Sequence, residues 1–299
     1  MPNYGSVKPG KNSVRLKQQQ QLRIYVKGVL VMEKQARQQI FEQAKVWVLE
    51  AGEQIRKRME QPFKVETKSN PNDLVTELDK DTERFFVEKI RSHYPEHQLF
   101  GEEGFGDDIQ TLDGTVWIVD PIDGTMNFVH QKRNFAISIG IYYDGIGEIG
   151  LIYDVMADVL YTAIRGEGAY KNGEPLERLE EPQELDKSIL AINSFWALRN
   201  KRVGEEGIHR LVEKVRGTRS FGSAALEFAF VAEGIIDGYL TMSLMPWDIA
   251  AGIVIVEEVG GITTQANGQP VNMLEKNSIL TSHRDIHQEI VNEYVELKI

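Results

Sequence analysis

Apolar residues recur at every third or fourth position in two segments of the first hundred residues. The first repeat spans residues 36–55 and is followed by Pro62, and the second spans residues 79–93. This spacing is typical of helices that bury one face, and proline ends a helix because it has no N–H to donate. The pattern therefore predicts a long helix from about Glu33 and a shorter helix from about Asp79.

Shorter apolar runs, separated by glycine-bearing breaks, follow between residues 117 and 165. Residues 135–143, 147–153 and 159–165 are apolar throughout or alternate between apolar and polar positions. Such runs are typical of β-strands, and short connections favour antiparallel neighbours. We therefore predict an antiparallel meander, preceded by a short strand at residues 117–119.

Strand and helix patterns alternate in the last third of the chain, after a polar segment at residues 179–187 that contains Pro182. This segment is predicted to connect two lobes. Alternating strands and helices favour layered α/β packing. The predicted strands are residues 189–192, 239–242 and 279–281, and the predicted helices are residues 204–215, 223–233, 247–259 and the C-terminal segment.

The chain is predicted to have a leader, residues 1–31, an N-terminal α+β lobe, residues 32–181, and a C-terminal α/β lobe, residues 182–299. The leader carries six Lys or Arg residues, no acidic residue and a glutamine run. That composition predicts disorder, and the apolar run at residues 29–31 is shorter than the roughly 7–15 residues of a signal-peptide core. We further hypothesise that Met32 is the natural start, because codons for the residues shortly before it can contain a ribosome-binding sequence.

The composition narrows the classes of function. The chain has 299 residues, 41% apolar content, a net charge of −11 and no cysteine. The lack of cysteine excludes disulfides, thiolate catalysis and cysteine-ligated zinc, and suits a reducing cytoplasm. Nucleic-acid phosphates repel an acidic surface, so no nucleic-acid partner is expected. No apolar run reaches the roughly 20 residues that cross a bilayer, so no membrane partner is expected.

The segment WIVDPIDGTMNFVH, residues 117–130, sends a short strand directly into two carboxylates, Asp120 and Asp123. Hard cations are bound by carboxylates when a rigid turn aims them at one point. Pro121 restricts the turn, and Gly124 lets the chain fold back so that its amide and that of Thr125 face a phosphate. The segment therefore predicts a site for metal and phosphate. The alternative is a polar loop in which Asp120 caps the following helix.

Three further acidic segments lie beside apolar runs: GEEG at residues 101–104, WD at residues 247–248 and DLVTELD at residues 73–79. Together with residues 117–130 and the strings GTRSFGSAAL and GEGAYKNG, they resemble the inositol monophosphatase family of magnesium-dependent, lithium-sensitive phosphatases. The resemblance covers residue 32 to about residue 299. It implies a layered α/β/α/β/α sandwich, the fold type shared with fructose-1,6-bisphosphatase, and a homodimer.

The resemblance also implies a metal site for two or three Mg²⁺ ions. The expected ligands of the first ion are Glu102, Asp120 and the backbone carbonyl of Ile122. Asp120, Asp123 and Asp248 are expected to hold the second ion, so that Asp120 bridges the two. Asp and Glu clusters suit this role because magnesium prefers oxygen ligands.

The catalytic residues implied by the resemblance are Glu102, Asp79 and Thr125. A third, weaker ion is expected near Glu102 and Asp79. Thr125 and Asp79 would orient a metal-bound water for attack on the phosphate, and Glu102 would assist its deprotonation. Glu103 is expected to support these groups or to form a salt bridge. The alternative for Asp79 is that it only caps the helix that begins near it.

The resemblance implies a substrate-binding set drawn from both lobes. Ser223 has a second interpretation as a simple helix N-cap. Thr241 departs from the family, since many members carry a glutamate there that accepts hydrogen bonds from the substrate's ring hydroxyls. The implied contacts are Asp123, Gly124, Thr125, Gly222, Ser223, Ala224, Thr241 and Asp248.

We therefore expect a phosphate monoester hydrolase of the inositol-1-phosphate type with broad specificity. A hydrogen bond to a charged group contributes roughly 1.5–3 kcal/mol, so its loss at Thr241 weakens discrimination about ten- to a hundredfold. One alternative is a phosphatase of the same superfamily acting on 3′-phosphoadenosine 5′-phosphate, NADP or a sugar bisphosphate. Another is a regulatory or assembly protein whose site is vestigial.

Overall fold

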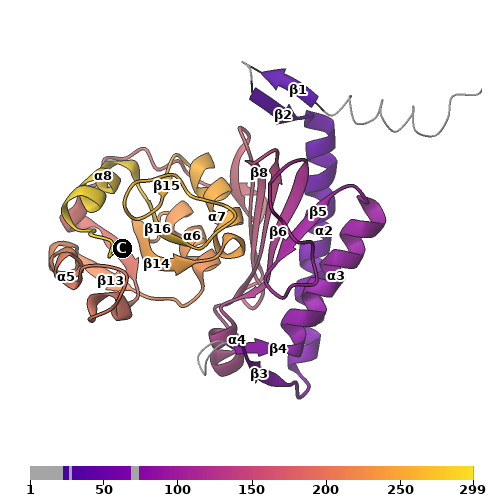
Figure 1. Cartoon of the computed structure of the whole chain (residues 1–299), viewed down its shortest axis with the longest axis horizontal. Helices are drawn as coiled ribbons and strands as arrows, with labels where there is room; N and C mark the ends of the chain where they lie inside the picture. Colours follow the sequence, from indigo (N-terminus) through magenta and orange to yellow (C-terminus); the bar gives the residue numbers. More distant parts are fainter. Residues whose placement is uncertain (1–22, 27–28, 69–73, 299) are drawn as a thin grey trace, which may run out of the picture.

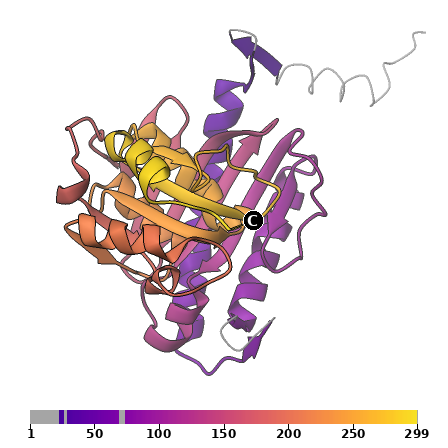
Figure 2. The ribbon, with the colours of Figure 1, turned by 60° about the vertical axis from the view of Figure 1, so that its left-hand side comes forward.

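The protein, described from a computed structural model for residues 23–26, 29–68 and 74–298, is built in five layers (Figure 1). From one side to the other these layers are a helix pair, a large sheet, a second helix pair, a small sheet and a third helix pair. The predicted α/β/α/β/α sandwich is therefore confirmed. Figure 2 brings the C-terminal half forward, with the small sheet and its outer helices in orange and yellow.

The large sheet has seven strands in the order β11-β10-β9-β8-β7-β6-β5. Its central strands, β6 to β9, form the predicted antiparallel meander, in which short turns at residues 144–145 and 155–158 join β7 to β8 and β8 to β9. Only β5 runs parallel to its neighbour, β6. The strands are β5 Gln98–Gly101, β6 Thr115–Asp123, β7 Ala136–Tyr143, β8 Ile146–Asp154, β9 Val159–Ile164, β10 Gly168–Lys171 and β11 Glu174–Pro175.

Helices α2 (Lys34–Met59) and α3 (Glu77–His93) cover one face of this sheet (Figure 1). Both helices were predicted from the apolar period, and each buries its apolar stripe against the strands. Trp47 is 1% exposed and packs against Trp117, with ring centroids 5.6 Å apart. These contacts form a core that holds β6 rigidly where it enters the acidic motif.

The small sheet has five strands in the order β13-β12-β14-β16-β15. Two helices lie between it and the large sheet and are apolar nearly all round, because both of their faces are buried. Two amphipathic helices cover its outer face. The strands are β12 Ile189–Ile192, β13 Gly217–Arg219, β14 Gly238–Leu244, β15 Ile262–Thr264 and β16 Asn277–Ser282; the inner helices are α6 Ala224–Ala232 and α7 Pro246–Glu258, and the outer ones are α5 Glu205–Lys214 and α8 Arg284–Glu293.

Several short elements were not predicted. Strands β1 (Arg23–Val26) and β2 (Val29–Met32) pair in antiparallel fashion in a part of the leader where no regular structure was expected. Their valine, isoleucine and tyrosine residues favour strands, a local preference that the basic composition of the leader obscures. The rest of the leader, residues 1–22, and residues 27–28 lie outside the described residues.

A second short hairpin, β3 (Val65–Thr67) with β4 (Leu74–Thr76), lies near α4 (Thr125–Gln131) at one end of the large sheet (Figure 1). The connection at residues 179–187 contains one 3₁₀ turn, Leu185–Lys187, and leads into the small sheet. Among the described helices, none combines the length and the apolar character needed to cross a membrane.

Helix α7 sits unusually close to the large sheet because glycines face it. A β carbon on Gly140 would lie 2.5 Å from the β carbon of Ala250, and one on Gly150 would lie 2.5 Å from the carbonyl oxygen of Ala251. Such distances are far below van der Waals contact, so any larger residue forces a shift. The two glycines therefore let the start of α7 approach the end of β6.

Candidate active site

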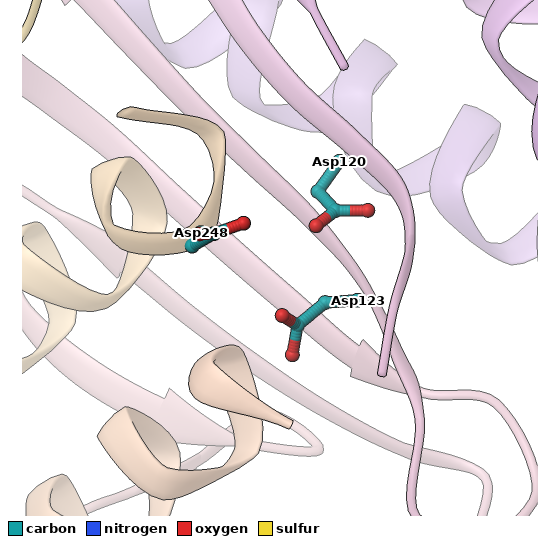
Figure 3. A group of neighbouring side chains, drawn as sticks. All are labelled: Asp120, Asp123 and Asp248. Carbon is teal, nitrogen blue, oxygen red and sulfur yellow. The ribbon is translucent and has the colours of Figure 1, made fainter. Parts of the chain in front are cut away.

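Three carboxylates from two distant parts of the chain face one another at the junction of β6 and α7 (Figure 3). Asp120 and Asp123 come from the end of β6, and Asp248 comes from the first turn of α7. One oxygen from each residue lies within 4.8 Å of the others. Hard divalent cations are bound by oxygens arranged in this way, so the donor set fits the expected metal.

The end of β6 is irregular, which turns both of its aspartates toward the same place. Its pairing with β7 shifts register between Asp120 and Asp123, with Pro121 in the interruption. Asp120 Oδ1 accepts the N–H of Ile122 at 3.0 Å, which fixes the first carboxylate against its own backbone. The interpretation of Asp120 as a cap of α4 is wrong, because the N-cap is Gly124 and no side chain caps that helix.

Gly124 adopts a left-handed backbone with φ of 91°, which disfavours any side chain. A β carbon there would lie 3.1 Å from the β carbon of Ser223 and 3.2 Å from the carbonyl oxygen of Gly222. The turn after Asp123 therefore packs directly on the segment that precedes α6. The structure thus brings together two of the predicted substrate segments, residues 123–125 and 222–224.

Asp123 is held by the start of α6. Its Oδ2 accepts the N–H of Ala225 at 2.8 Å and the hydroxyl of Ser223. The Ser223 oxygen also accepts the N–H of Leu226 at 3.3 Å, so the interpretation of Ser223 as an N-cap is confirmed. These bonds join the acidic motif at the end of β6 to the start of α6.

Asp248 is held by its own helix terminus. Its Oδ2 accepts the N–H of Met245 at 2.8 Å, and Pro246 begins the helix in the position where proline is tolerated. Ser138 on β7 donates to the carbonyl of Trp247 at 3.3 Å, which ties the same turn to the large sheet. The carboxylate therefore has little freedom to move away from β6.

Asp79 caps α3 and also reaches the motif turn. One carboxylate oxygen accepts the N–H of Thr76 at 2.8 Å and its hydroxyl at 2.5 Å, which completes a capping box. The other oxygen lies 3.2 Å from Thr125 Oγ1, which also lies 3.1 Å from the carbonyl oxygen of Ile122. Asp79 therefore has both roles at once: one of its oxygens caps α3, and the other reaches Thr125 in the motif turn.

Glu102 and Glu103 bind a lysine that the sequence analysis missed. Lys68 Nζ lies 2.7 Å from Glu102 and 2.6 Å from Glu103. The expected salt bridge of Glu103 is therefore confirmed. Glu102 lies outside the set of three mutually close carboxylates, although its charge acts strongly on Asp120. No local pattern around Lys68 pointed to this contact.

The buried carboxylates resist ionisation. Burial, together with the charges of Glu102 and the neighbouring aspartates, raises the pKa of Asp120 well above its usual value, and burial and Asp123 do the same to Asp248. Burial raises the pKa of Asp123 to about 7 and that of Asp79 to about 6. A divalent cation among these oxygens would offset the repulsion that raises the pKa values.

Thr241 on β14 is 6% exposed, and its hydroxyl donates to the hydroxyl of Tyr239 on the same face of the strand. Burial, together with the charges of Glu227 and Asp123, raises the pKa of Tyr239 well above its usual value, so Tyr239 is close to Asp123. Thr241 is therefore near the metal motif, as the expected substrate contact requires, but its hydroxyl already has a partner inside the protein.

Comparison with known proteins identifies the family. The profile of the inositol monophosphatase family matches residues 36–298. The inositol-1-monophosphatase of Bacillus subtilis is 54% identical over 260 residues, which cover 87% of this chain and 98% of that protein. The chain therefore belongs to the inositol monophosphatase family, a family of phosphatases, as its motifs predicted.

Solved structures of inositol monophosphatases have the same fold as this chain. Inositol monophosphatase II from Staphylococcus aureus superposes with a TM-score of 0.79 at 48% identity, covering 86% of this chain and 93% of the other. The same protein has been solved with inositol monophosphate; that structure has a TM-score of 0.77 at 46% identity and covers 86% of this chain and 93% of the other. It has also been solved with 2′-AMP, with a TM-score of 0.79 at 47% identity, covering 86% of this chain and 94% of the other. An IMPase/NADP phosphatase complexed with Mg²⁺ and phosphate has a TM-score of 0.79 at 28% identity, covering 87% of this chain and 99% of that one.

Proposed function

We propose that this protein is a magnesium-dependent hydrolase of phosphate monoesters, of the inositol-1-phosphate type, with broad specificity. The observation that carries the proposal is the convergence of Asp120, Asp123 and Asp248, whose pKa values are all raised. Leaving three carboxylates so close together is costly unless a cation binds them. A cation that takes part in the reaction would offset this cost and account for the cluster.

The residues that would hold the metal come from three segments. Asp120, the carbonyl of Ile122 and Glu102 are proposed for one Mg²⁺, and Asp120, Asp123 and Asp248 for another, with a third ion near Asp79. When bound, Mg²⁺ neutralises the phosphate oxygens and lowers the pKa of water. Glu102 lies close enough to Asp120 to affect its ionisation, which supports its place in the same centre.

Thr125 and Asp79 are proposed to orient the attacking water. The hydroxyl of Thr125 lies between a carboxylate oxygen of Asp79 and the carbonyl of Ile122, so its single proton points toward one of these two fixed acceptors. A hydroxyl held in this way directs its lone pairs toward the open side, where they can accept a hydrogen bond from water. Glu102 is proposed to take the proton that the water loses on attack.

The phosphate is proposed to lie against the turn at Gly124 and Thr125, and the alcohol part against residues 222–224. Gly124 packs on Ser223 and Gly222, so one ester can span both segments. Thr241 is neutral and engaged with Tyr239, which supports weak discrimination among alcohols. The relative solved with both inositol monophosphate and 2′-AMP supports the same breadth. We further propose a homodimer located in the cytoplasm and inhibited by lithium at Asp123 and Asp248.

The proposal is tested by measuring inorganic phosphate released from inositol 1-phosphate, glycerol 2-phosphate, 2′-AMP, NADP and 3′-phosphoadenosine 5′-phosphate. Hydrolysis is expected with added Mg²⁺ and none with a chelator. A strong preference for NADP or for the bisphosphate would favour the related phosphatases instead. A folded protein that hydrolyses none of these esters would favour the regulatory alternative.

A further inference from the structure

The loop that precedes α6, residues 221–222, is clamped through its backbone. The N–H of Phe221 donates to Glu227 Oε1 at 2.7 Å, and the carbonyl of Phe221 accepts from Asn127 Nδ2, also at 2.7 Å. The N–H of Gly222 points at the same Glu227 oxygen at 3.4 Å. Both backbone polar groups of Phe221 are therefore fixed by buried side chains from different helices.

These two clamps come from opposite sides of the junction between the lobes. Asn127 belongs to α4, within the acidic motif, and its Nδ2 also donates to the carbonyl of Asn134 at 2.8 Å. Glu227 belongs to α6, one turn after the loop. Gly222 has φ of 78°, a conformation that needs glycine, and a β carbon there would meet Asn127 at 3.1 Å. The loop therefore has one backbone path available to it.

Glu227 is a conspicuous residue for this task because it is 4% exposed. Its carboxylate accepts the two loop amides and the hydroxyl of Tyr239, whose oxygen accepts from Thr241. An apolar side chain would fill the same space without the cost of burying a carboxylate. The carboxylate is therefore explained by what it holds, which is the backbone of the loop.

We propose that Glu227 is a positioning residue for substrate recognition, which holds residues 221–222 in the shape that receives the alcohol part of the phosphate ester. This rests on the proposed phosphatase function. Asp123 is held separately, by Ser223 and by the N–H of Ala225, so the loop can shift while the metal carboxylates stay in place. Loss of Glu227 is therefore expected to act mainly on substrate affinity. Glu227 also acts on Asp123 through its charge, and Glu227→Gln removes that charge while it keeps an acceptor for the loop amides, so the two effects can be separated.

The chain provides a matched control in Glu83. This glutamate is also fully buried, and its two oxygens accept the N–H groups of Glu103 and Phe105 at 2.6 and 2.7 Å. It holds the loop that carries Glu102, on the metal side of the site. Glu83 and Glu227 thus each accept backbone N–H groups of a loop at the site. Substitutions at the two residues should separate effects on metal binding from effects on substrate binding.

The experiment compares Glu227→Leu, Glu227→Gln, Asn127→Ala and Glu83→Gln in steady-state kinetics. Glu227→Leu should raise KM for inositol 1-phosphate and 2′-AMP by about tenfold or more, the effect of losing a charged acceptor. Its kcat with p-nitrophenyl phosphate and its Mg²⁺ activation constant should change little. Glu227→Gln keeps an acceptor oxygen and should rescue KM. Asn127→Ala should raise the same KM, whereas Glu83→Gln should shift mainly the Mg²⁺ activation constant.

Hydrogen exchange at the amides of Phe221 and Gly222 provides a readout that does not need turnover. Protection should fall in Glu227→Leu and stay in Glu227→Gln. The proposal is overturned if KM and amide protection are unchanged in Glu227→Leu, or if all substrates and the Mg²⁺ constant are affected by the same factor. A wild type that retains loop protection but hydrolyses no ester with Mg²⁺ would instead remove the proposed function.

Discussion

Gly140 on β7 and Ala250 on α7 meet so closely that a β carbon on the glycine would lie 2.5 Å from that of the alanine. Two residues before Ala250, Asp248 faces the aspartates at the end of β6. The distance between α7 and the large sheet therefore sets the distance between Asp248 and the carboxylates of β6. A packing contact beside the carboxylate cluster thus helps to set the geometry of the proposed metal site.

Gly140→Ala is expected to displace the start of α7, because the clash involves backbone atoms of Ala250 as well as its side chain. Overpacking of this kind costs about 1–3 kcal/mol of unfolding free energy. The Mg²⁺ activation constant should rise severalfold. Gly217→Ala is the control, because a β carbon there meets only the flexible end of Arg219 at 3.5 Å. Equal metal dependence in both variants would show that the helix position does not matter.

Lys68 competes with a cation for Glu102, since its ammonium lies 2.7 Å from that carboxylate. Lys68→Met should therefore lower the Mg²⁺ concentration needed for half-maximal activity. The change should be a few-fold, because partly exposed ion pairs contribute about 1 kcal/mol or less. Lys89→Met, which removes an ion pair with Glu50 between α3 and α2, should have no effect on it. Weaker activation by Mg²⁺ in Lys68→Met would mean that the lysine supports the metal.

The metal-free protein is expected to lose stability as pH rises. Unfolded aspartate has a pKa near 3.8, whereas the folded pKa is about 6 for Asp79 and about 7 for Asp123. Between those values the folded state holds more protons, so unfolding free energy falls with increasing pH. With chelator, the melting temperature should be lower at pH 8 than at pH 5.5. Mg²⁺ should raise it most at pH 8, and the absence of such a rise would contradict metal binding by these carboxylates.

The wild type is expected to tolerate different alcohols, because Thr241 has no charge and is bonded to Tyr239. Values of kcat/KM for inositol 1-phosphate, glycerol 2-phosphate and 2′-AMP should lie within about a hundredfold of one another. Thr241→Glu should increase the relative preference for inositol 1-phosphate, and Thr241→Val should not. A wild-type preference for inositol 1-phosphate above that range would contradict the role assigned to Thr241.

The sequence was most informative in segments where candidate ligand residues directly follow a strand or helix pattern. The spacing of Asp120 and Asp123 around Pro121 predicted two convergent carboxylates, and the apolar periods predicted α2, α3 and the meander. Asp248 could be assigned only through the family resemblance, because its approach depends on how α7 packs against Gly140 and Gly150. The order of the layers came from the resemblance for the same reason.

The buried residues that support the loops were not predictable. Glu83 accepts the N–H of Glu103, which lies 20 residues after it in the chain. Glu227 accepts the N–H of Phe221, which lies six residues before it. Such bonds have no local sequence signal, and a glutamate on a helix usually lies on the exposed face. Lys68 was missed because ion pairs between distant segments depend on the fold. Short strands such as β5 and β15 offer too few residues for a period to be recognised.

The most direct test of the central claim is a paired measurement on Asp120→Asn, since Asp120 is the carboxylate proposed to bind two ions. The substitution removes a carboxyl group whose ionisation is opposed by burial and by Glu102 and the neighbouring aspartates, so at high pH the melting temperature of the metal-free protein should rise above that of the wild type. Mg²⁺-dependent phosphate release should fall by orders of magnitude in the same folded variant. A variant that keeps wild-type activity with Mg²⁺, or one that melts lower than the wild type at high pH without metal, would contradict the account.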